Sequence, residues 1–232
     1  MLNDVIIACD FSSREELNSF LENFTDEKPY LKVGMELFYK EGVEMVRDLK
    51  SRGFKIFLDL KLHDIPNTVK KAMRNLASLG VDITNVHAAG GIEMMKAAKQ
   101  GLLEGSIGGH TPLLIAVTQL TSTNADVLKN ELLIDTPLDE TVKKYAENAK
   151  AAGLDGVVCS PLEAPIIKKM DNFISVTPGI RLAGDSADDQ KRVTTPKLAR
   201  ELGSAFIVVG RSITGAVNPL EAYKKCKKEF LG

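Results

Sequence analysis

The chain has 232 residues, of which 44% are hydrophobic and 26% are charged, a composition typical of one large globular domain or two small ones. With 30 basic and 31 acidic residues its formal net charge is −1, which excludes the field that would attract nucleic acid or an anionic membrane. The opening residues MLNDVIIACD lack the basic start of a signal peptide, and no stretch approaches the roughly 20 apolar residues of a membrane span. We therefore expect neither.

The first short apolar run begins near residue 5, and similar runs rich in valine and isoleucine recur along the chain. We expect them to form buried parallel strands at residues 5–8, 31–34, 55–60, 82–86, 113–117, 156–159, 173–176 and 206–209. The segments between them have helical periodicity, as in the series Val69, Met73, Leu76 and Ala77. About eight strand-helix units predict a single TIM barrel over residues 1–232. An open doubly wound sheet is the competing architecture.

Proline and glycine mark the expected helix ends. Pro66, Pro196 and Pro219 lie where a first helical turn would begin. Asn218 is a candidate N-cap for the last of these helices. Glycines follow four expected helix ends, at positions 53, 80, 153 and 203.

Two loops are longer than their connections require, residues 119–138 and residues 180–194. Both leave the carboxyl ends of predicted strands, where barrel enzymes build their active sites. The second, with the sequence RLAGDSADDQKRV, is either a lid that closes over a ligand or a plain surface insertion.

The third predicted strand continues as FLDLKLHDIPNTV. Strand alternation places Asp59 and Lys61 on the face toward the barrel mouth, and Asp64 follows at the turn. Asp10 closes the first strand and Lys32 lies in the second. Such charges could form a purely structural network, but burying them costs several kcal/mol each unless the pairing is excellent. We therefore favour a catalytic cluster.

A lysine between two aspartates is expected to stay protonated, so Lys61 is a candidate proton donor rather than a nucleophile. The carboxylates beside it would repel a substrate carboxylate but tolerate neutral carbon dioxide. Each charge contact at about 4 Å contributes about 4 kcal/mol at an effective dielectric constant near 20. Because large enzymatic accelerations need roughly 8–23 kcal/mol, remote binding energy must supply the rest.

A phosphate site is predicted at the eighth strand, which ends FIVVGRSITGAVNP. Gly210 lets the backbone approach a ligand, and the guanidinium of Arg211 matches phosphate oxygens. Arg181 and Gln190 in the preceding long loop could reach the same anion. TIM barrels commonly bind phosphate after strands seven and eight, although a solvated pair of surface arginines remains the alternative.

The motif DLKLHDIPNTV resembles the signature of the orotidine 5′-monophosphate decarboxylase family. The likeness continues, in the family's order, through ACD, LKVGMELF, AVTQLTS, VTPGIR and VVGRSI, and it is closest to the monofunctional bacterial type. The resemblance implies a barrel of the ribulose-phosphate-binding type that decarboxylates orotidine 5′-monophosphate (OMP) to UMP in the cytoplasm. It implies no metal and no organic cofactor.

Carried over to this chain, the resemblance implies that Lys61 protonates C6 of the pyrimidine, with Asp59 and Asp64 completing the charge array. It implies a wider set of contacts, with Asp10 and Lys32 at the ribose hydroxyls and the array, Thr118 near the base, Gln190, Gly210 and Arg211 at the phosphate, and Arg181 on the closing loop. In this family Asp64 and Thr68 reach into the neighbouring subunit's site, so a homodimer is implied.

Two alternatives to this function remain. Magnesium-dependent sugar-phosphate decarboxylases and synthases share the Asp-x-Lys-x-x-Asp spacing, but a cation at Lys32 opposes metal binding. Neither the histidines nor the widely spaced cysteines, Cys9, Cys159 and Cys226, form a zinc-type motif. The second alternative is a non-catalytic nucleotide-phosphate-binding barrel, which would have no need for the acidic array.

Overall fold

The computed structural model describes residues 3–25, 27–185 and 193–232. Eight parallel strands form a closed barrel in sequence order, with β8 hydrogen-bonded to β1, so the TIM barrel is confirmed and the open sheet is excluded. The strands are β1 Asp4–Ala8, β2 Tyr30–Gly34, β3 Lys55–Leu62, β4 Ile83–His87, β5 Leu113–Val117, β6 Gly156–Val158, β7 Ile174–Ile180 and β8 Phe206–Val209.

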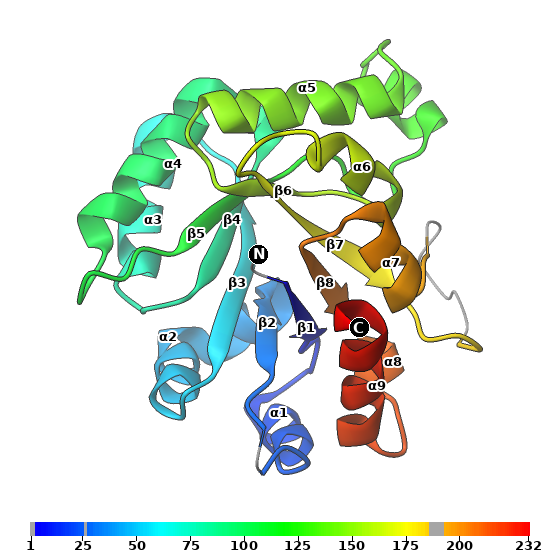
Figure 1. Cartoon of the computed structure of the whole chain (residues 1–232). Helices are drawn as coiled ribbons and strands as arrows, with labels where there is room; N and C mark the ends of the chain where they lie inside the picture. The colour runs from blue at the N-terminus through cyan, green and yellow to red at the C-terminus, as the bar shows by residue number, and fades with distance from the viewer. Residues whose placement is uncertain (1–2, 26, 186–192) are drawn as a thin grey trace.

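Helices surround the barrel on its outside (Figure 1). They are α1 Arg14–Leu21, α2 Met35–Ser51, α3 Pro66–Ala77, η1 Ala88–Gly90, α4 Gly91–Gly105, η2 Val127–Glu131, α5 Leu138–Ala151, η3 Pro161–Glu163, α6 Ala164–Ile167, α7 Pro196–Leu202, α8 Arg211–Thr214 and α9 Pro219–Leu231. The C-terminal α9 packs against β1, so the last helix of the chain lies beside its first strand. No helix in the described ranges is long and apolar enough to cross a membrane.

The predicted helix boundaries are confirmed. Pro66, Pro196 and Pro219 are the first residues of α3, α7 and α9. Proline has no backbone N–H, and at the first helical position an N–H would have no partner within the helix. The side chain of Asn218 caps α9 by accepting a hydrogen bond from the N–H of Glu221. Glycines follow the helix ends as expected, and the last of them, Gly203, caps α7 in the left-handed conformation with a φ of 94°.

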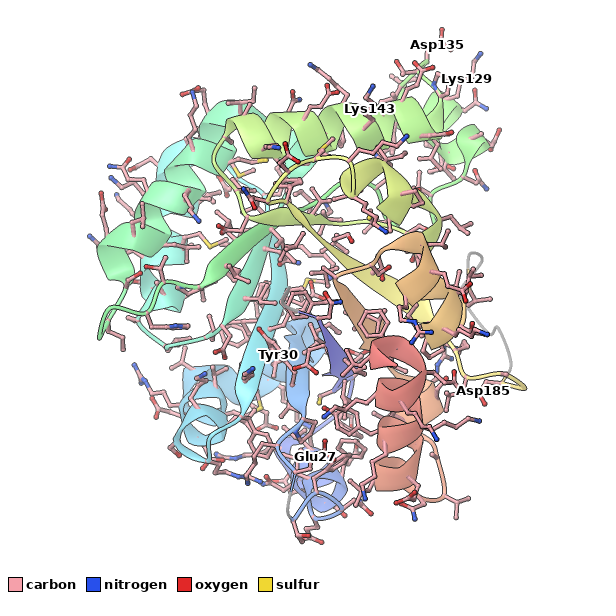
Figure 2. The ribbon with its side chains drawn as sticks, viewed as in Figure 1. Glu27, Tyr30, Lys129, Asp135, Lys143 and Asp185 are labelled. Atoms are coloured by element: carbon pink, nitrogen blue, oxygen red, sulfur yellow. The ribbon has the colours of Figure 1, made fainter. Side chains whose placement is uncertain are left out.

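The core has two parts, one between the strands and the helices and one inside the barrel. The inner part is an apolar layer, defined here by Ile6, Ala8, Tyr30, Phe57, Ile83, Ile115, Val176, Phe206 and Val208. Tyr30, labelled in Figure 2, meets Phe206 edge to face with 6.2 Å between ring centroids. This layer fills the barrel, so a ligand can only enter above it.

Two strands run further than predicted, and each is irregular at its carboxyl end. β3 reaches Leu62, with a register shift relative to β4 between Leu58 and Leu62. β7 reaches Ile180, with a shift relative to β8 between Thr177 and Ile180. A bulge interrupts the pairing locally, bends the strand and re-aims its side chains, and in both strands the pairing resumes beyond the shift.

Candidate active site

Four charged side chains form a row across the mouth of the barrel. The ammonium of Lys32 lies 2.8 Å from the Asp10 carboxylate and 3.5 Å from that of Asp59. The other oxygen of Asp59 is 2.7 Å from the ammonium of Lys61. The signs alternate along the row, so each inner charge has an opposite charge on both sides. The structure thus brings together four of the five residues that the sequence placed in this cluster, all except Asp64.

Strand alternation explains why the row lies directly above the apolar layer. Lys32 and Asp59 each follow a residue of that layer by two positions, Tyr30 and Phe57 respectively. Residues two apart on a strand face the same side. The charges therefore point inward, one step closer to the mouth.

Burial and pairing act against each other in this row. Burial alone would raise the pKa of Asp59, but the attraction of Lys32 and Lys61 outweighs it, and the pKa is lowered. Burial alone would lower the pKa of Lys32, but the attraction of Asp59 and Asp10 outweighs it, and the pKa is raised. Both groups are therefore held in their charged forms around neutral pH.

The backbone of Lys61 has a φ of 51°, in the left-handed region that non-glycine residues rarely adopt. Its N–H donates to the side-chain oxygen of Asn85 on β4 at 2.8 Å, and the amide of Asn85 donates to Asp59 at 2.7 Å. Sequence reasoning missed Asn85. The signal was available, because Asn85 follows the inner-layer residue Ile83 by two positions.

A cavity of about 750 Å³ opens above the row, within the size range of small-molecule sites. Asp10, Lys32, Asp59 and Lys61 line one part of it, and its other lining includes Pro178, Gly179, Arg181, Gly210 and Arg211. The predicted phosphate residues at the ends of β7 and β8 therefore share one cavity with the charged row. Gln190 lies outside the described residues.

The structure does not place Thr118 in this cavity. Thr118 is 2% exposed, and its hydroxyl donates to the carbonyl of Val158 on β6 at 3.0 Å. Val117 lines the cavity, so alternation turns the next side chain away from it. Thr121 and Ser122, further along the same loop, do line it, and a contact between Thr118 and the nucleotide stays a prediction.

Asp64 and Thr68 are exposed, and neither lines the cavity. The Asp64 carboxylate accepts a hydrogen bond from the N–H of Ile65 at 2.6 Å. Within the described ranges, no ion pair joins it to another side chain of this chain. The expectation that Asp59, Lys61 and Asp64 meet is thus met for the first two only.

The residues at the mouth do not resemble a metal centre. No group of three or more His, Cys, Asp or Glu side chains is placed to hold a metal ion in the described part of the chain. The space between the carboxylates of Asp10 and Asp59 is filled by the ammonium of Lys32, which supplies the positive charge that a cation would bring.

Comparison with known families decides the chain's affiliation. The model of the orotidine 5′-phosphate decarboxylase / HUMPS family matches residues 3–226. The chain belongs to this family. The match includes both the charged row and the predicted phosphate residues.

Individual proteins of the orotidine 5′-phosphate decarboxylase / HUMPS family match this chain over nearly its whole length. The orotidine 5′-phosphate decarboxylase of Bacillus cytotoxicus is 58% identical over 235 residues, which span 100% of this chain and 99% of the relative. The crystal structure of orotidine 5′-phosphate decarboxylase from Lactobacillus acidophilus has a TM-score of 0.90 at 48% identity, covering 99% of this chain and 100% of that one. The one from Pyrococcus horikoshii OT3 has a TM-score of 0.76 at 26% identity, covering 98% and 99%.

Proposed function

We propose that this protein decarboxylates OMP to UMP and carbon dioxide, as a single catalytic domain over residues 1–232 and without a metal or organic cofactor. The observation that carries the proposal is the alternating row of Asp10, Lys32, Asp59 and Lys61 beside a cavity shared with Arg211. Full-length relatives named orotidine 5′-phosphate decarboxylase support it.

The chemistry follows from the charges. The carboxylate of Asp59 repels a carboxylate on the pyrimidine, and that repulsion ends when neutral carbon dioxide leaves. The electron pair of the broken C–C bond remains on C6, where the ammonium of Lys61 stabilises it and donates a proton. With Lys61 held 2.7 Å from Asp59, the proton donor and the repelling group lie on the same side of the cavity.

Phosphate binding supplies the remaining energy in this proposal. A charge contact contributes about 4 kcal/mol at a separation of about 4 Å, less than the roughly 8–23 kcal/mol that enzymes supply. Gly210 and Arg211 hold the phosphate, with Arg181 and Gln190 from the preceding loop. Contacts made far from C6 can be used at the transition state, which links phosphate binding to turnover.

The direct test is conversion of OMP to UMP, followed by the loss of absorbance, with and without EDTA. Undiminished turnover in EDTA supports the proposal. Activity lost in EDTA and restored by magnesium would favour the sugar-phosphate decarboxylase and synthase alternative. Binding of OMP without turnover would favour a non-catalytic nucleotide-binding barrel.

A homodimer completes the proposed site. Asp64 and Thr68 are exposed and do not line this chain's own cavity, as expected of residues that serve a neighbouring subunit. The adjacent Ile65 is 67% exposed and Tyr39 of α2 is 70% exposed, and such large apolar side chains are typical of interfaces. The three cysteines are buried, and none of them forms a disulfide bond within the described residues, which agrees with a reducing cytoplasm.

Mixing two inactive variants tests the shared site. Lys61→Ala and Asp64→Ala chains should each lack activity. Because a two-fold interface makes each site from both subunits, a mixed dimer has one site with both residues intact, and an equal mixture should recover about a quarter of the wild-type sites. No recovery after verified subunit exchange would exclude a shared site.

A further inference from the structure

Asn85 is buried at the centre of β4, and none of its surface is exposed. It does not line the cavity, so it cannot act on a substrate directly. Its side-chain oxygen accepts from the N–H of Lys61 at 2.8 Å, and its nitrogen donates to Oδ1 of Asp59 at 2.7 Å. These partners fix the orientation of the amide, because a backbone N–H can only donate and a carboxylate can only accept.

The three residues close a ring of hydrogen bonds. The ammonium of Lys61 donates to the same Oδ1 of Asp59 that accepts from Asn85. Asn85 in turn holds the backbone of Lys61. One amide group therefore fixes the main chain of the proton donor and the carboxylate that pairs with its ammonium.

The local backbone explains why Lys61 needs such support. The register of β3 against β4 shifts between Leu58 and Leu62, so Lys61 lies where regular pairing is interrupted. Its φ of 51° is an unfavourable conformation for a residue with a side chain, and it persists only when the surroundings enforce it. The Asn85 side chain takes the role of the missing strand partner for the Lys61 N–H.

We propose that Asn85 is a positioning residue for decarboxylation, which holds Lys61 in its left-handed conformation and orients Asp59 against its ammonium. The inference rests on the proposed function and adds a residue to it. Few side chains can replace Asn85, since the position needs one acceptor and one donor on a short stem. Leucine has a similar branched shape but offers neither, and aspartate offers the acceptor but places a second carboxylate against Asp59.

The principal variants are Asn85→Leu and Asn85→Asp, and the matched control is Thr84→Val. Thr84 is the preceding residue, is equally buried, and donates from its hydroxyl to the carbonyl of Leu58 at 3.1 Å. The control therefore removes one buried hydrogen bond between the same two strands without touching Lys61 or Asp59. Any loss due to general weakening of this strand pair should appear in all three variants.

We expect Asn85→Leu to lower kcat about 100-fold, the effect of a displacement of about 1 Å in a reacting group, with KM within about threefold of wild type because the phosphate contacts are intact. Thr84→Val should keep kcat within about threefold. If Asn85→Leu does not fold, Asn85→Asp tests the proposal instead, because it changes only the side-chain NH₂ group to an oxygen. It should also lower kcat about 100-fold. Equal kcat values for the position-85 variants and the control would overturn the proposal.

The pH profile separates positioning from a purely structural role. The charged groups facing Asp59 are Lys32 from β2 and Lys61 from β3, with His87 of β4 further away, and the substitutions remove none of these three residues. Loss of the Asn85 hydrogen bond should raise the pKa of Asp59, so the acidic limb of kcat should move to higher pH. The shift should be larger for Asn85→Asp because two adjacent carboxyl groups disfavour double ionisation. An unchanged limb in both variants would contradict the proposal.

A crystal structure of Asn85→Leu gives a readout that needs no activity. We expect the φ of Lys61 to leave the left-handed region and its ammonium to separate from Asp59. A Lys61 geometry identical to that of wild type would overturn the inference whatever reaction the protein performs. Failure of the wild-type protein to convert OMP would instead refute the proposed function and leave this structural test in force.

Discussion

Ile83 and Asn85 lie two residues apart on β4, both inside the barrel and both without exposed surface, yet their surroundings are opposite. Ile83 belongs to the apolar layer that fills the barrel. Asn85 belongs to the hydrogen-bonded group of Asp59 and Lys61. The same change from apolar to polar occurs on β2 between Tyr30 and Lys32, a distance of about 6.6 Å along a strand.

The comparison shows how stability and chemistry are divided within one barrel. Burying a large apolar side chain contributes about 1.5–3 kcal/mol, so the apolar layer stabilises the fold. Burying charges costs several kcal/mol each before pairing offsets it, so the charged row is a poor source of stability. The layer provides a rigid floor, and the row directly above it can hold charges in fixed positions.

The largest effect is expected from Lys61→Ala, which changes the charged row and leaves the apolar layer intact. Removing the ammonium should lower kcat by about 10²–10⁴-fold or more, because general acid catalysis alone contributes that much and the electrostatic stabilisation of C6 is lost with it. The apolar layer is untouched, so the thermal midpoint should stay close to that of wild type. A steady-state assay with a melting curve checks both. A variant that retains most of its rate would refute the assigned role.

Arg211→Ala acts on the far side of the same cavity and should have a smaller effect. A hydrogen bond to a charged group contributes about 1.5–3 kcal/mol, so kcat/KM should fall by about 10–150-fold. Because phosphate binding energy is used at the transition state, kcat should fall as well as KM rise. A change in KM alone would show that phosphate binding and decarboxylation are independent. Lys197→Ala, on α7, is a control for the loss of a positive charge outside the cavity lining.

Much of this arrangement could be predicted because its local signals agree. The valine-rich runs gave the eight strands, and the prolines at positions 66, 196 and 219 marked the helix starts. Alternation placed Lys32 and Asp59 inside. The same rule, applied to Asn85 after Ile83 and to Thr118 after Val117, would have included the first and excluded the second. Both differences come from reading a motif or an apolar run in place of each side chain's direction.

The remainder could not be predicted from alternation. The bulge at Leu58 to Leu62 and the left-handed φ of Lys61 arise from contacts with β4, which lies more than 20 residues further along the chain. In the proposed homodimer the partner of Asp64 lies on a second subunit, which one chain does not contain. Tertiary pairing and assembly decide such features, and the sequence of β3 alone carries no sign of them.

Ile83→Val tests the contribution of the apolar layer to stability. Loss of one buried methylene group typically costs about 0.5–1.5 kcal/mol. At about 2–4 °C per kcal/mol for a chain of this size, the thermal midpoint should fall by about 1–6 °C. Turnover at temperatures well below the midpoint should be unchanged within about twofold. A large fall in kcat with little change in the midpoint would show that the layer itself positions the charged row.

The smallest effect is expected from pH within the neutral range. The pKa of Asp59 is lowered from its ordinary 3.8, so the stability that its pairing contributes is present above pH 3.8 and is lost as pH falls through the lower folded value. The pKa of Lys32 is raised from its ordinary 10.5, so its contribution is present below pH 10.5 and is lost as pH rises through the higher folded value. Between these limits neither group changes charge. The free energy of unfolding can be measured by denaturant titration for wild type and for Asp59→Asn. The difference between the two proteins should be constant from about pH 5 to 9. A difference that varies with pH in this window would mean that one of the two groups titrates there.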